Sequence, residues 1–145
     1  MARDLLSLAA EFEQLPSKID KAASKIAVDV AMVITGDLAY KTPVDTSNAL
    51  SNWQVSLNMP TSFEIPPHYP GIKGSTFRAS AAETLSKAKI VLTAKKPGEA
   101  IFIANNVDYI VDLNNGSSRQ QPAGFVQRAE LLGRKLAGNS WLKLK

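Results

Sequence analysis

A long run of helically spaced apolar residues constrains this chain more than any other feature. Within the first 33 residues, apolar side chains recur at spacings of three and four. The positions are Leu5, Leu8, Phe12, Leu15, Ile19, Ala22, Ile26, Val30 and Val33. This spacing puts them on one face of a helix, so the sequence predicts a helix over residues 3–40. Thr42-Pro43 is expected to end it.

Two alternatives stay open for this helix. Pro16 lies inside the apolar stripe, where it either kinks one helix or begins a second helix as its first residue. The stripe either packs on the chain's own sheet, which we favour, or forms a coiled-coil seam. With 145 residues the chain is long enough for one domain with a single core.

The remaining patterns predict strands and two shorter helices. Residues 53–58 alternate between apolar and polar, as a half-buried strand does. The alanine-rich stretch 75–89 favours a helix, and Ile90–Leu92 is either a strand or the end of that helix. The predicted final helix covers residues 122–137. Its apolar stripe and C-cap candidate are Phe125, Ala129, Leu132, Leu136 and Gly138.

Together these elements predict an α+β domain spanning residues 1–145. A long N-terminal helix (1–41) and the C-terminal helix would pack on a mainly antiparallel, four-stranded sheet. The predicted strands cover residues 53–58, 90–94, 100–105 and 108–113. An extended loop at 58–76 and a C-terminal tail at 138–145 complete the domain.

Three segments are predicted to contact other chains. Loop 58–76 contains four prolines and two glycines, and its apolar residues favour docking on a neighbour over a floppy excursion. The second segment is the turn after the last predicted strand. The third is the C-terminal tail, which would add an edge strand to a partner. The predicted interface residues are Pro66, His68, Tyr69, Ile72, Asn115, Gly116, Gln121, Trp141 and Leu142.

The basic excess is confined to the C-terminal region. From Arg119 onward there are six basic residues and one acidic residue, whereas residues 1–118 hold eleven basic and twelve acidic ones. This asymmetry indicates a surface that meets an acidic partner or nucleic acid, and the alternative is a solvated helix face. The residues assigned to this basic or DNA-channel-facing surface are Arg119, Arg128, Arg134 and Lys135.

Enzyme chemistry finds little support in the sequence. There is no cysteine and one histidine, so a thiolate metal site is excluded and a zinc site lacks ligands. Neither a nucleophile elbow nor a phosphate-binding glycine loop is present. Asp108 and Asp112 are expected to be solvated or salt-bridged rather than a cation site. We therefore predict no catalytic residue, cofactor or metal, and neither a signal peptide nor a membrane span.

Three blocks of sequence, in one order, carry a resemblance to a known family. They are TPVDTSNALSNWQVS (42–56), HYPGIKGST (68–76) and KPGEAIFIANNVDYIVDLNNGSSRQQPAGFVQRA (96–129). With the preceding helix they cover roughly residues 20–132, and they resemble the tail-completion or neck proteins of tailed bacteriophages. The chain departs from the family pattern at Ser47, where glycine is usual, at Asp108, where proline is frequent, and at Asn114, where an acid is common.

The resemblance implies a structural virion protein rather than an enzyme. Such a subunit forms a ring, typically six-fold, at the head-proximal end of the tail, where it contacts the connector and tail-tube proteins. Viral DNA passes through the lumen with transient, non-specific contacts. The expected location is the virion neck, after assembly in the host cytoplasm. A connector-side adaptor or stopper is the alternative within this class, and a small basic DNA-binding protein is the alternative from another class.

Overall fold

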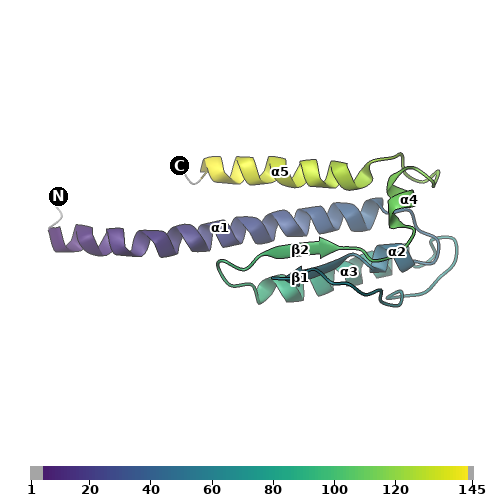
Figure 1. Cartoon of the computed structure of the whole chain (residues 1–145), viewed down its shortest axis with the longest axis horizontal. Coiled ribbons are helices and arrows are strands. Elements are labelled where there is room, and N and C mark those ends of the chain that lie inside the picture. Colours follow the sequence, from purple (N-terminus) through teal and green to yellow (C-terminus); the bar gives the residue numbers. More distant parts are fainter. Residues whose placement is uncertain (1–4, 144–145) are drawn as a thin grey trace.

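A computed structural model of the chain describes the backbone of residues 5–143 and the side chains of residues 14–143. The described part is mostly helical, with one short pair of strands (Figure 1). The elements are α1 (Leu5–Lys41), α2 (Asn48–Ser51), β1 (Gln54–Leu57), α3 (Phe77–Thr93), β2 (Ile101–Ala104), α4 (Ile110–Asn114) and α5 (Phe125–Lys143).

Helix α1 is the central element of the molecule. Helix α5 runs antiparallel along one side of α1, and the strand pair with α3 lies on the other side (Figure 1). The short helices α2 and α4 and the long loops gather at the end where α1 finishes. The opposite end of α1 extends beyond the rest of the molecule.

The predicted N-terminal helix is confirmed over the described residues, and of the two alternatives for Pro16 the structure has one helix that continues through it. Its stripe changes role along its length. Leu15 and Ile19 are about half exposed and Val30 and Val33 are partly buried, whereas the buried residues Ala31 and Leu38 lie outside the predicted stripe. The stripe positions before residue 14 lie outside the described side chains.

The buried core follows α1 in three clusters. Ala31 packs with Val55, Ala88 and Leu92 between α1, β1 and α3. Further along, Leu38 meets Trp53 and, from α5, Phe125 and Ala129. At the end of the helix, Ala39 packs with Val44, Leu50 and Ala81. Because α1 contributes to all three clusters, it holds the two sides of the molecule together.

The predicted four-stranded sheet is wrong. Within the described residues the sheet has two antiparallel strands, with Gln54 opposite Ala104 and Leu57 opposite Ile101. Residues 90–93 instead finish α3, and Ala94 is its C-cap. The physical reason is a helical period: Ala81, Thr84, Ala88 and Leu92 are all buried on one face of α3, and the short apolar run simply ends that face.

The strand predicted at 108–113 is also wrong. Val107 is buried, and the chain then turns, with Ile110 N donating to Val107 O at 3.2 Å. Helix α4 follows, and its residues Ile110 and Leu113 both pack against the cluster around Phe125. A spacing of three residues fits one helical face, and six residues are too few to distinguish it from a strand pattern.

The C-terminal tail predicted at 138–145 is helical as far as the structure describes it. Helix α5 continues through Gly138 to Lys143, so Trp141 and Leu142 do not form an edge strand. The buried line of α5 also differs from the prediction, because it passes through Phe125, Ala129 and Gly133 while Leu132 is exposed. A glycine in the buried line lets α1 and α5 approach closely, which hydrophobicity alone does not indicate.

Candidate interaction surfaces

The three sequence blocks meet at the end of α1 in a polar assembly, which we call the junction. It comprises residues 42–52, 65–76 and 105–124. Several of its polar side chains are almost completely buried, including Thr42, Ser47, Ser51 and Asn52. Every buried side-chain nitrogen and oxygen of the described residues has a hydrogen-bond partner. A satisfied buried network fixes one arrangement of the loops that it joins.

Asn52 clamps the long loop to the domain. Its Oδ1 accepts a hydrogen bond from Ile65 N at 2.8 Å, and its Nδ2 donates to Ile65 O at 2.9 Å. The same Nδ2 also donates to Asn48 O at 2.9 Å. The side-chain amide therefore pairs with a backbone residue as a neighbouring strand would.

Gln120 makes an equivalent clamp between two other segments of the junction. Val44 N donates to Gln120 Oε1 at 2.9 Å, and Gln120 Nε2 donates to Val44 O at 3.0 Å. The block that contains Thr42-Pro43 is thereby joined to the loop before α5. Below it, Trp53 Nε1 donates to Thr42 Oγ1 at 2.7 Å, which satisfies the indole inside the core.

Ser47 has an unusual backbone conformation for a serine. Its backbone is left-handed, with φ of 68°, a conformation that glycine adopts without strain. The serine instead places its Oγ 2.8 Å from Thr76 Oγ1. Nearby, Asp45 Oδ1 accepts from Lys73 N at 2.7 Å, so the first two sequence blocks are joined at both residues.

Loop 58–76 contains no helix or strand, as predicted, but it is held to its own chain at several points. His68 N donates to Ser51 Oγ at 3.0 Å, and Tyr69 N lies 3.3 Å from Ser80 Oγ. Pro66, Tyr69 and Ile72 are exposed, and His68 is half-buried. Docking on a neighbouring chain through these residues stays a prediction.

The pKa of His68 is lowered from its ordinary value of 6.5. Burial is the main cause, and the positive charge of Lys87 lowers the pKa further, while Glu83 opposes both. The ring is thus kept neutral to lower pH than a solvated histidine.

The turn before α5 contains Gly116 in a backbone conformation that favours glycine, whereas Asn115 beside it has a negative φ. Gly116 has φ of 92°, and a Cβ there would lie 3.3 Å from Ala123. Asn114 caps the start of α5, because its Oδ1 accepts from Val126 N at 2.9 Å. Asn115 is exposed, and Gln121 lines an open hollow of about 340 Å³ beside Tyr40 and Phe77.

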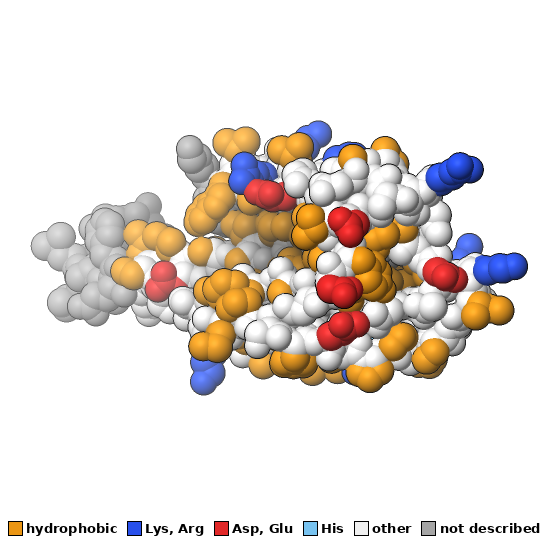
Figure 2. All heavy atoms as spheres, turned by 45° about the vertical axis from the view of Figure 1, so that its right-hand side comes forward, with side chains coloured by type: hydrophobic (Ala, Val, Ile, Leu, Met, Phe, Trp, Pro, Cys, Tyr) orange, Lys and Arg blue, Asp and Glu red, His pale blue; other side chains and the backbone are white. Residues whose placement is uncertain are grey.

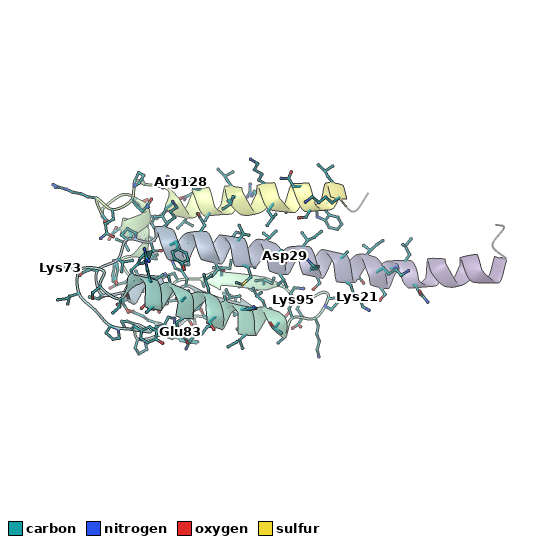
Figure 3. The ribbon with its side chains drawn as sticks, turned by 180° about the vertical axis from the view of Figure 1, so that it is seen from behind. Lys21, Asp29, Lys73, Glu83, Lys95 and Arg128 are labelled. Atoms are coloured by element: carbon teal, nitrogen blue, oxygen red, sulfur yellow. The ribbon has the colours of Figure 1, made fainter. Side chains whose placement is uncertain are left out.

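The four predicted basic residues lie in the loop before α5 and on α5 itself. Arg119 is exposed in the loop before α5. Arg128, at the start of α5 (Figure 3), donates to the carbonyl oxygens of Ala123 and Pro122 at 2.8 and 3.2 Å. Arg134 pairs with Glu130, one turn earlier on the same helix. Lys135 is exposed on α5.

Several residues of these surfaces were missed from the sequence. The clamps of Asn52 and Gln120 join segments far apart in the chain, and no local pattern signals them. Val111 and Leu131 are exposed apolar residues that could have been found. Leu131 falls outside the apolar stripe of its helix, which is the signal of a second, outward-facing contact.

Among the described residues, no group of three or more acidic, histidine or cysteine side chains is arranged to hold a metal ion. None of the helices, as far as they are described, has both the length and the apolar character to cross a membrane. Comparisons with family models, curated proteins and solved structures identify no match.

Proposed function

We propose that this chain is a structural virion protein of a tailed bacteriophage, forming a ring at the head-proximal end of the tail. The observation that carries the proposal is the junction. The three sequence blocks that resemble tail-completion and neck proteins are separate in the chain, yet they are joined by hydrogen bonds of Ser51, Gln120 and Asp45. Three resembling segments that also lie together in the folded chain support the proposal more strongly than three resemblances in sequence alone.

The surface is compatible with assembly into a ring. A ring subunit presents two different faces to two neighbours, because its contacts are head-to-tail. Exposed apolar side chains occur on loop 58–76 and on α4, at the end where α1 finishes, and along α5. In the proposed ring these surfaces contact neighbouring subunits, connector proteins and the tail tube, while DNA passes through the lumen.

The proposal is tested by placing a stop codon in the gene of this protein within its phage. Filled heads and separate tails should accumulate in the lysate, and expression of the chain in trans should restore joined particles. Electron micrographs of the lysate give the ratio of joined to separate structures. Normal yields of joined, infectious particles without the chain would refute the proposed function.

A further inference from the structure

Helix α5 has a second apolar line on the side away from α1. Phe125, Ala129 and Gly133 are buried against α1, so the opposite side of the helix faces outward. The residues on this outer face are Leu131, Lys135, Gly138 and Leu142, spaced by four, three and four. Leu131 is 62% exposed and Leu142 is 67% exposed. We call these four residues the outer face of α5.

The outer face of α5 is better suited to a protein partner than to DNA. Phosphate contacts are made by cations and polar donors, and the outer face presents two leucines beside one lysine. Two neighbouring cations are already engaged, Arg128 with backbone carbonyls and Arg134 with Glu130. Leucines at this exposure gain free energy only where an apolar surface covers them.

Gly138 is not explained by the packing of this chain. A Cβ at this position would meet nothing within 4 Å, so no contact within the chain requires glycine there. Glycine in a helix interior costs about 1 kcal/mol relative to alanine. A neighbouring chain that approaches closely between Leu131 and Leu142 supplies a reason for the glycine.

A second surface, around α4, carries acidic side chains, and we call it the acidic end. It combines Glu64, Asp108 and Asp112 with Val111, which is 64% exposed. Glu64 and the neighbouring Tyr109 share Asn48 Nδ2 as donor, at 2.8 and 3.2 Å. Figure 2 shows acidic side chains gathered on this face, with lysines and arginines mainly toward its margins.

The carboxylates of the acidic end have no cationic partner within the described part of the chain. The ion pairs among residues 14–143 are Lys25 with Asp29 and Arg134 with Glu130. Lys135 is in neither of these pairs, so within the described part of the chain the acidic end and the outer face of α5 present charges of opposite sign. Each surface also presents an apolar side chain more than 60% exposed.

We infer that the outer face of α5 binds the acidic end of a second copy of this chain. The inference rests on the proposed ring and names its subunit contact. Val111 packs between Leu131 and Leu142, and Asp108 and Asp112 lie toward Lys135. Because the two surfaces are different, the contact is head-to-tail, and each copy keeps one free surface for the next. Charge complementarity sets the register and favours this partner over others.

Cross-linking tests the contact directly, because the chain has no cysteine of its own. The variant Val111→Cys with Leu131→Cys is treated with a short bismaleimide, both as purified protein and in virions. A ladder of covalent multimers is expected, since each copy joins two neighbours. The control is Val111→Cys with Ile90→Cys, because Ile90 is equally exposed, at 69%, but lies on α3, across α1 from α5.

Charge reversal gives a second, independent readout by sedimentation. Self-association should weaken by about tenfold or more in the single variant Lys135→Glu, and also in the double variant Asp108→Lys with Asp112→Lys. Combining all three changes in one chain should restore much of it, because the charges are complementary again. Lys89→Glu on α3 is the matched control and should leave association unchanged.

The outcomes separate this inference from the proposed function. Virions that contain the chain but yield no ladder, or the same ladder with Ile90→Cys, would overturn the contact and leave the ring intact. A chain absent from virions would remove the ring itself. If Lys135→Glu leaves association unchanged and instead weakens salt-sensitive binding to double-stranded DNA, α5 faces DNA and the contact is wrong.

Discussion

At the scale of single residues, the molecule depends on polar side chains that replace missing secondary structure. Asn52 and Gln120 each pair with both backbone groups of a distant residue, and so hold loops that no sheet supports. From the sequence, the turn residues of these segments were predictable, since Pro43, Gly116 and their neighbours have strong local preferences. Their partners were not, because a hydrogen bond across 76 positions leaves no periodic trace.

Ser47 should tolerate glycine better than alanine. Ser47→Ala keeps the left-handed backbone strain and loses the hydrogen bond to Thr76, so it should lower the free energy of unfolding by about 1 kcal/mol or more. Ser47→Gly loses the same bond but removes the strain, so it should stay near the original stability. Urea unfolding of both variants measures the difference. Equal losses would show that the backbone at Ser47 is not strained.

His68 should make stability depend on pH in a window set by its lowered pKa. The unfolded chain takes up a proton near pH 6.5, whereas the folded chain takes it up only at lower pH. Stability is therefore fully present above pH 6.5 and falls as the pH drops toward the folded pKa. Because the chain has one histidine, His68→Gln should flatten this slope in urea titrations across the window. An unchanged slope would contradict the burial of the ring.

At the scale of elements, long patterns were predictable and short ones were not. The stripe of α1 repeats over many turns, and the predicted helix is confirmed where the structure describes it. The runs at 90–94 and 108–113 are too short to distinguish a strand from a helical turn. Their state is decided by tertiary contacts, in particular the burial of Leu92 and the packing of Leu113 near Phe125.

The two interior glycines of α5 should respond to alanine in opposite ways. A Cβ at Gly133 would overlap the side chain of Ile34 and lie 3.2 Å from Val30 Cγ1. Ile34 is β-branched and has little rotamer freedom in a helix, so Gly133→Ala should cost about 1–3 kcal/mol. Gly138→Ala meets nothing and should stabilise the monomer by up to about 1 kcal/mol.

Thermal unfolding of the two alanine variants, at a concentration where the chain is monomeric, measures these effects. The α1–α5 packing requires a lower melting temperature for Gly133→Ala and a higher one for Gly138→Ala. If both variants were stabilised alike, α1 and α5 would not approach each other closely at Gly133.

At the scale of the whole molecule, a slender helical scaffold displays chemically different surfaces at separate places. The basic excess of the C-terminal region was visible in the sequence, but its meaning changed once α5 was placed. Two of its arginines are bound within the chain, and the outward line carries leucines. From the sequence, both a neighbouring subunit and the DNA channel were candidate partners of the basic C-terminal region. The arrangement of α5 favours the neighbouring subunit.

The most direct test of the account is electron cryo-microscopy of the neck of the virion that encodes this chain. We expect a ring of this fold between the connector and the first ring of the tail tube. Within it, the outer face of each α5 should be covered by the acidic end of the next subunit. A neck in which no density fits this chain would contradict the central claim that it is a ring-forming virion protein.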